Sequence, residues 1–383
     1  MAYESRPALF QPIQIGHITL QHRIVFAPCT RRRATKYEHV PILPLMKSYY
    51  EQRASTHGTL LISEGTIIAK KAGGYTNVPG IWSEEQIKGW KEIVDAVHAQ
   101  GSFIFLQLWA LGRAAIPDVL QVEGVDHAIS SGSIPISKPG SSIPVSLTLE
   151  GIREFVELYA QAAKNAVFGA GFDGVEIHSA NGYLVDQFLQ DTCNNRTDEY
   201  GGSVENRSRF GLEVVEAVTK AVGEERTGIR ISPWSMFQDM RMKDPIPQFT
   251  HYATQLKERF PKLAFLHVIE PRIDGSESRE VGLANESNDF IREIWSPRTF
   301  ISAGGYTRDS AIRTAEEKGD VIGFGRYFIS NPDLPVRIQN DIPWTKYDRK
   351  TFNTPGESDL TAVGYLDYPF AEAKNVLVHQ ASL

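Results

Sequence analysis

The sequence predicts a (β/α)8 barrel, with one domain spanning residues 1–383. Eight short β-branched or apolar runs alternate with longer segments of helical period, and no low-complexity tract or shift in composition marks a domain boundary. Eightfold alternation of strand and helix is typical of parallel strands that close into a barrel. A doubly wound open sheet is the weaker alternative.

The predicted strands are the runs rich in Val, Ile, Leu and Phe. They cover residues 23–28, 59–63, 103–108, 174–177, 227–231, 265–268, 299–303 and 321–324. Amphipathic periodicity predicts the helices between them, and N-cap residues such as Ser83 and Ser203 support it. The predicted helices cover residues 83–100, 152–170, 203–222, 248–260, 288–295 and 309–318.

Two segments lie outside this alternation. Residues 13–20, with Gly16 and His17 at their centre, predict a hairpin that closes the bottom of the barrel. Residues 116–147, rich in Ser, Gly and Pro, form a long excursion after the third strand. Long connections are often functional lids, and a loop after a barrel strand faces the active site, so we expect this excursion over the barrel mouth.

Composition and charge exclude several classes of protein. With 42% hydrophobic residues the chain is too apolar for intrinsic disorder, yet no stretch approaches 18 apolar residues, so no membrane association is expected. A net charge of -6 gives no basic field for nucleic acid. Cys29 and Cys193 lie far apart without metal-ligand spacing, which predicts neither disulfides nor a metal site. We expect a cytoplasmic protein, monomeric or homodimeric.

Three consecutive basic residues, Arg31, Arg32 and Arg33, follow the first strand. Such a run is typical of a solvated loop or of the neighbours of a bound anion, and a localisation signal is the less favoured interpretation.

Polar residues interrupt two strands that should be almost wholly apolar if helices cover both faces of the sheet. Gln107 lies in the third strand and Arg230 in the fifth. Because a buried charge needs a partner, Arg230 either forms an ion pair with a carboxylate such as Glu176 or Glu64, or faces negative charge on a bound cofactor.

Glycines follow the seventh and eighth strands, where barrels of this kind usually bind phosphate. Gly304 and Gly305 end the seventh strand, and Gly325 and Arg326 end the eighth. Glycine lets backbone amides approach an anion, and arginine supplies a bidentate fork. Either glycine group alone would equally indicate a tight turn, but together they predict a phosphate site.

The fourth strand ends in a group of hydrogen-bonding residues. His178 and Asn181 supply two donors that could converge on one oxygen, and Tyr183 supplies a phenolic proton nearby. A single His at a strand end is usually structural, but this combination favours a catalytic site.

With these residues in place, the chain resembles the old yellow enzyme family of flavin-dependent ene-reductases over nearly its whole length. The motifs that carry the resemblance are Phe26-Ala27-Pro28-Cys29-Thr30-Arg31, Ser63-Glu64-Gly65-Thr66, Gln107-Leu108-Trp109, residues 178–189, residues 196–203, Glu270-Pro271-Arg272, Gly325-Arg326 and Asn331-Pro332-Asp333-Leu334.

The resemblance implies non-covalently bound FMN that NAD(P)H, usually NADPH, reduces and that an enone or enal reoxidises. Hydride would pass to the β carbon while Tyr183 protonates the α carbon, with the carbonyl oxygen held by His178 and Asn181. Thr30 and Gln107 would contact the flavin pyrimidine ring, and Arg230 its N1 and C2 carbonyl. The remaining implied cofactor contacts are Pro28, Cys29, Gly65, Gly304, Gly305, Gly325 and Arg326.

Tyr75, Trp109 and Phe237 would line the substrate pocket, although an aromatic core is an equal alternative. The chain departs from the family at Asn353, where a Tyr is common, and residues 271–285 are shorter, which predicts a more open rim. Cys29 stands where larger apolar residues are common. A small buried hydrophobe is the favoured interpretation there, over tuning of the flavin potential.

Other functions stay open at this stage. A reductase or isomerase of secondary metabolism fits the same motifs, but Tyr183 favours net reduction because isomerising relatives often replace that proton donor. A phosphosugar lyase or isomerase would share the phosphate site, yet no Lys ends a strand and no carboxylate cluster suggests a metal. A flavin-binding protein with little turnover is the third possibility.

Overall fold

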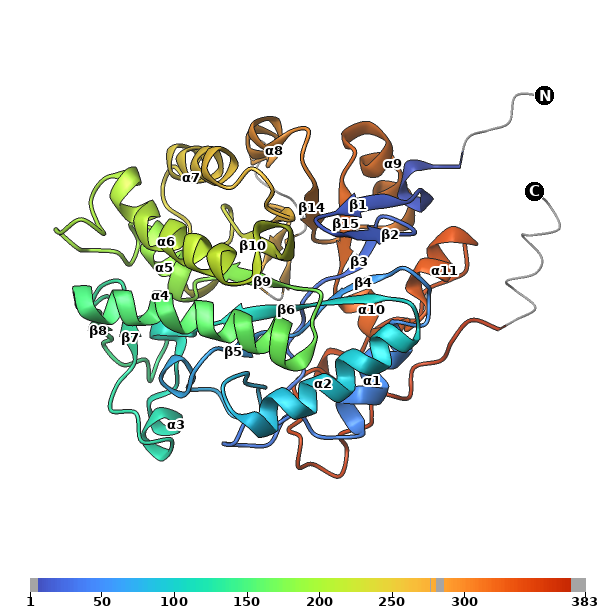
Figure 1. Cartoon of the computed structure of the whole chain (residues 1–383), viewed down its shortest axis with the longest axis horizontal. Coiled ribbons are helices and arrows are strands. Elements are labelled where there is room, and N and C mark those ends of the chain that lie inside the picture. The colour runs from blue at the N-terminus through green and yellow to red at the C-terminus, as the bar shows by residue number, and fades with distance from the viewer. Residues whose placement is uncertain (1–5, 276, 280–285, 373–383) are drawn as a thin grey trace.

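The computed structural model describes residues 6–275, 277–279 and 286–372, and eight parallel strands form a closed barrel (Figure 1). The last strand pairs with the first, with Phe324 opposite Phe26, so the predicted (β/α)8 barrel is confirmed and the open sheet is excluded. The strands are β3 (Ile24–Phe26), β4 (Leu60–Ile62), β6 (Phe103–Trp109), β9 (Gly174–Ser179), β10 (Thr227–Ile231), β11 (Phe265–Ile269), β14 (Phe300–Ala303) and β15 (Val321–Phe324). The two-residue strand β5 (Thr66–Ile67) also pairs with β6.

Helices surround the barrel, and all six predicted helices are present (Figure 1). Ser83 and Gln86 form a reciprocal capping box at the start of the second helix, as the sequence pattern predicts. The helices are α1 (Leu45–Arg53), α2 (Glu84–Ala99), α3 (Pro117–Val122), α4 (Leu149–Lys164), α5 (Leu184–Leu189), α6 (Val204–Val222), α7 (Ile246–Arg259), α8 (Asp289–Trp295), α9 (Arg308–Lys318), α10 (Arg326–Ser330) and α11 (Leu334–Gln339). A π-helical turn, η4 (Asn165–Ala170), extends α4, and 3-10 turns are η1 (Ala8–Phe10), η2 (Lys70–Ala72), η3 (Gly112–Ala114), η5 (Glu224–Arg226), η6 (Phe237–Asp239) and η7 (Arg349–Thr351).

The predicted hairpin closes the bottom of the barrel. Strands β1 (Ile13–Ile15) and β2 (Ile18–Leu20) pair antiparallel and bury their apolar side chains against the barrel interior, including Phe105 and Phe265. Gly16 turns the hairpin at φ +54°, and a Cβ there would lie 1.9 Å from the carbonyl oxygen of Glu225. Only glycine meets both constraints.

The excursion after the third strand does not cover the barrel mouth, so that prediction is wrong. Besides α3 it contains β7 (Ile129–Ser130) and β8 (Val145–Ser146), and it packs on α5. The hydroxyl of Ser130 donates to Gln187 Oε1 at 2.8 Å, and that of Ser131 donates to the Gln187 carbonyl at 2.7 Å. These contacts with a buried residue hold the excursion at the side of the barrel.

The C-terminal segment, and not the excursion, lies at the barrel mouth. Two buried arginines hold it there. The guanidinium of Arg31 donates to the Gly364 carbonyl at 2.8 Å, and that of Arg33 donates to the Thr351 carbonyl at 3.0 Å. Both side chains are fully buried, which contradicts a solvated loop for these two residues. Tyr365 also stacks on Tyr49, with ring centroids 4.0 Å apart. Residues 341–353 are thereby brought to the mouth.

In the part of the chain that the structure describes, no helix has both the length and the apolar character needed to cross a membrane.

Candidate active site

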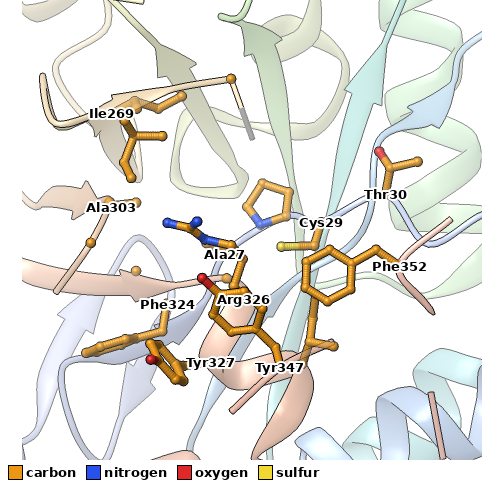
Figure 2. Close-up of a pocket in the computed structure, with 18 of the residues that line it drawn as sticks. Ala27, Cys29, Thr30, Ile269, Ala303, Phe324, Arg326, Tyr327, Tyr347 and Phe352 are labelled. Atoms are coloured by element: carbon orange, nitrogen blue, oxygen red, sulfur yellow. The ribbon is translucent and has the colours of Figure 1, made fainter. Parts of the chain in front are cut away.

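A cavity of about 1070 Å³ opens at the C-terminal ends of the barrel strands, and every site residue that the sequence predicted lines it. Figure 2 shows Thr30 and Cys29 on one side of this space and Ile269 and Ala303 on the other. Drug-sized ligands occupy pockets of ~300–1,000 Å³, so this cavity has room for a large cofactor together with a small substrate.

The floor of the cavity contains a buried hydrogen-bonded group centred on Glu176. Its carboxylate accepts from Gln107 Nε2 at 2.7 Å and from His267 Nδ1 at 2.6 Å. Because both oxygens of Glu176 are engaged in this way, the proposed ion pair with Arg230 does not form. Among the described residues, Arg230 makes no ion pair or hydrogen bond, and its Nε is buried without a partner. The ion-pair interpretation of Arg230 is therefore wrong.

Glu64, the other carboxylate considered for Arg230, is also engaged elsewhere. Its Oε2 accepts from the backbone N–H of Arg31 at 3.0 Å. Burial lowers the pKa of Arg230, and the nearby charge of Glu176 opposes that effect. An unpaired guanidinium that lines a cavity needs an anionic partner there.

The contact with Glu176 also sets the orientation of the Gln107 amide. The amide nitrogen of Gln107 faces Glu176 and donates to its Oε1 at 2.7 Å. The amide oxygen is left as an acceptor for a ligand. With Arg230 beside it, the floor offers one acceptor and one cation. The pyrimidine edge of a flavin, with its N–H and its electron-rich carbonyls, complements this pair.

The predicted phosphate residues gather at one end of the cavity. Gly304 has φ +135°, and a Cβ there would lie 2.6 Å from Ile273 Cγ1. A Cβ at Gly325 would lie 2.8 Å from Cys29 Sγ. Glycine at these positions keeps backbone accessible to a ligand, and Arg326, whose Nη2 donates to Ser278 Oγ at 2.6 Å, lines the same space.

The two cysteines are free thiols with different surroundings. Cys193 is buried, and its Sγ lies 3.1 Å from the Gln187 carbonyl oxygen, which agrees with a structural role. Cys29 lines the cavity and is partly exposed to it, so it is not a wholly buried hydrophobe. Burial nevertheless raises the pKa of its thiol, which favours the uncharged form.

His178 lies in β9, and Asn181 and Tyr183 lie on the turn that follows this strand. Asn181 has φ +56°, and the turn is held on both sides because its N–H donates to Ser232 Oγ at 2.8 Å and its carbonyl accepts from Gln238 Nε2 at 2.9 Å. The side chains differ from the backbone in this respect. Among the described residues, His178 Nδ1 and Asn181 Oδ1 are buried and have no hydrogen-bond partner. The rings of His178 and Tyr183 meet at 74° with centroids 4.9 Å apart. These groups are arranged to meet a ligand.

The protonation states of His178 and Tyr183 suit complementary roles. Burial lowers the pKa of His178 well below its usual value, and the charge of Arg230 adds to this effect. Burial raises the pKa of Tyr183 well above its usual value, and the neighbouring Tyr75 adds to this effect. At neutral pH the imidazole is uncharged, and the phenol keeps the proton that it could transfer.

We expect the His178 imidazole to be mostly neutral at pH 6.5, because its pKa lies well below that ordinary value. Imidazole nitrogen chemical shifts measured by NMR between about pH 8 and about pH 6 would check this, with the His178→Asn variant assigning the signal. A titration midpoint at or above 6.5 would contradict the expectation.

The three aromatic residues predicted for substrate contact all line the cavity. Trp109 meets Tyr183 edge-on at 4.9 Å between ring centroids and Tyr75 at 5.7 Å. Phe237 is 39% exposed, which excludes a core role for that residue. Gly65 is required beside Trp109, because a Cβ there would lie 2.6 Å from the indole.

Sequence reasoning missed the residues that the C-terminal segment brings to the cavity. They include Ile342, Trp344, Tyr347 and Phe352, and Asn353 lies beside them. No periodic pattern marks this segment, and its place depends on contacts with distant residues such as Arg31, Arg33 and Asn331. At the rim, β12 (Ile273–Asp274) pairs with β13 (Glu277–Ser278). Residues 276 and 280–285 of the short loop lie outside the described residues, so its predicted openness stays a prediction.

The described residues contain no cluster of three or more metal-ligating side chains, and no lysine lines the cavity. A Schiff-base or metal-dependent lyase therefore lacks its key groups at this site.

Comparisons with known proteins identify the family of the chain. The sequence profile of the NADH:flavin oxidoreductase / NADH oxidase family matches residues 8–344. The chain is 51% identical to NADP-dependent oxidoreductase lnbE of Aspergillus flavus, covering 95% of this chain and 96% of the relative. It is 52% identical to chanoclavine-I aldehyde reductase fgaOx3 of Penicillium roqueforti, with 95% and 96% covered. Old Yellow Enzyme from Pichia sp. AKU4542 superimposes with a TM-score of 0.86 at 38% identity, covering 95% of this chain and 94% of that chain. The chain therefore belongs to the NADH:flavin oxidoreductase / NADH oxidase family, the family of the old yellow enzymes.

Proposed function

We propose that this protein is an FMN-dependent ene-reductase that uses NADPH to reduce the alkene of a small α,β-unsaturated aldehyde or ketone. The observation that carries the proposal is one cavity in which the unpaired side-chain atoms of His178 and Asn181 lie beside the protonated Tyr183. The unpaired Arg230 and the oriented Gln107 line the same cavity and supply the cofactor side.

The cofactor contacts follow from the donors and acceptors available. Gln107 would accept from the pyrimidine N–H, Arg230 would balance negative charge at the adjacent carbonyl, and Thr30 would add a hydroxyl contact. Gly304, Gly305, Gly325 and Arg326 would hold the phosphate, while Pro28, Cys29 and Gly65 line the space between. When bound, FMN takes hydride from NADPH and supplies it to the alkene.

The protein side chains would then polarise and protonate the substrate. Neutral His178 donates through one ring nitrogen and Asn181 through its amide, and both meet the carbonyl oxygen, where negative charge develops. Tyr183 gives its proton to the α carbon as hydride arrives at the β carbon. Trp109, Tyr75 and Phe237 form apolar walls beside the substrate.

The relatives support an aldehyde as the carbonyl component. One relative is named for reduction of chanoclavine-I aldehyde. A role in secondary metabolism fits the same relative, and the retained Tyr183 favours reduction over isomerisation. The free thiols Cys29 and Cys193 support a reducing compartment such as the cytoplasm.

Purification and stopped-flow kinetics test the function. The protein is expected to carry flavin absorbance near roughly 460 nm, to be bleached by NADPH, and to regain colour with cinnamaldehyde. A colourless protein that FMN does not reconstitute would overturn the cofactor assignment. Bleaching by NADPH without reoxidation by any enal or enone would overturn the alkene assignment.

A further inference from the structure

Arg32 differs from the two arginines that flank it. Arg31 and Arg33 are fully buried and hold the C-terminal segment, whereas Arg32 is partly exposed and lines the cavity. Its backbone has φ +58°, the left-handed region that a non-glycine residue enters at a cost. The hydrogen bonds of Arg31 and Arg33 fix the backbone on both sides of Arg32. The Arg32 side chain is therefore directed into the cavity and not toward the carbonyls that its neighbours bind.

The Arg32 guanidinium faces an aromatic ring. It lies over the Tyr75 ring at 5.3 Å from the centroid, and among the described residues it makes no ion pair or side-chain hydrogen bond. Other arginines of the cavity differ in this respect. Arg349 pairs with Glu277, and Arg308 lies 3.3 Å from Asp341. Among the described residues, the fork of donors of Arg32 thus stays available to a ligand in the cavity.

Arg32 belongs to the substrate side of the cavity. Tyr75, which it covers, packs edge-on against Trp109, and Trp109 packs edge-on against the proposed proton donor Tyr183. Burial raises the pKa of both tyrosines, and the charge of Arg32 opposes that rise. An oxyanion bound by Arg32 would therefore sit near the substrate carbon that receives the proton.

We propose that Arg32 is an oxyanion-binding site that makes this cavity favour α,β-unsaturated carbonyl substrates carrying a carboxylate. The inference rests on the proposed ene-reductase function and names the substrate class of that site. A phosphate group of NADPH has the same recognition chemistry, but the contact with Tyr75 favours the substrate as the source of the anion.

The test compares cinnamaldehyde, which is neutral, with 4-carboxycinnamaldehyde, which differs by one carboxylate. The measured quantity is the ratio of kcat/KM for the charged aldehyde to kcat/KM for the neutral one. We expect Arg32→Met to lower this ratio about tenfold, equivalent to about 1.4 kcal/mol, and Arg32→Lys to restore part of it. Methionine is unbranched, like arginine, so the left-handed backbone is no more strained in the variant.

Lys71→Met is the matched control. It removes the same single charge from an exposed pair with Glu154, outside the cavity, and should leave the ratio unchanged. KM for NADPH and for NADH, measured in the Arg32 variants, shows whether Arg32 binds the substrate carboxylate or a phosphate group of NADPH.

Two outcomes would overturn the inference: an unchanged ratio in Arg32→Met, including an equal loss for both aldehydes, or a rise confined to the KM for NADPH. Each would occur in a protein that still reduces cinnamaldehyde. If the unsubstituted protein reduces neither aldehyde nor any other enone, the proposed function itself fails.

Discussion

Tyr183→Phe is expected to slow alkene reduction by about a hundredfold or more while flavin reduction by NADPH stays within about twofold. The variant keeps the ring that packs on Trp109 and His178 and removes only the hydroxyl. Because the pKa of Tyr183 is raised well above its usual value, the hydroxyl is protonated at neutral pH and is available to the substrate. Hydride transfer from NADPH needs no proton from it.

Stopped-flow measurement of the two half-reactions separates these steps. Tyr75→Phe is the matched control, because it removes the hydroxyl of another tyrosine of the same cavity and leaves the Tyr183 phenol in place. Its effect on alkene reduction should be much smaller. An equal loss in both half-reactions of Tyr183→Phe would exclude the residue as the proton donor.

Arg230→Met is expected to weaken FMN binding about a hundredfold without lowering the stability of the apoprotein. In the described part of the chain the guanidinium has no ion-pair or hydrogen-bond partner, so its removal breaks no contact there. It does remove the cation that would balance negative charge on the flavin. The same substitution therefore has different consequences for the cofactor complex and for the empty protein.

Fluorescence titration of FMN into the apoprotein measures the first effect, and urea denaturation of the apoprotein measures the second. Arg230→Lys keeps the charge but loses the planar fork. Its FMN affinity should lie between those of the unsubstituted protein and Arg230→Met. Unchanged FMN affinity in Arg230→Met, or a marked loss of apoprotein stability in both variants, would show that Arg230 serves the barrel and not the cofactor.

Much of the fold follows from local patterns. The eight strands are short apolar runs, and the six predicted helices are amphipathic, four of them with a side-chain N-cap, so each is recognisable from neighbouring residues alone. Site residues at strand ends can also be predicted from the sequence, because the barrel brings the C-terminal ends of all its strands to one face. His178, Gly304 and Arg326 are therefore found in one cavity although 148 residues separate the first from the last.

Other features depend on contacts between distant parts of the chain. The excursion at residues 116–147 resembles a lid in composition, but Gln187 holds it at the side of the barrel. Glu176 looks like a partner for Arg230 because the two strands are neighbours, yet Gln107 and His267 occupy its oxygens. In both cases the choice among several polar partners is made by packing, which a local pattern does not encode.

The sequence by itself determined the barrel, the positions of its strand ends and the residue types available for cofactor and substrate. The tertiary structure decided the directions of three consecutive arginines. Arg31 and Arg33 face carbonyls more than 300 residues away, and Arg32 faces the cavity. The physical reason is that a buried guanidinium goes where acceptors are, and those acceptors exist only once the C-terminal segment has packed against the barrel.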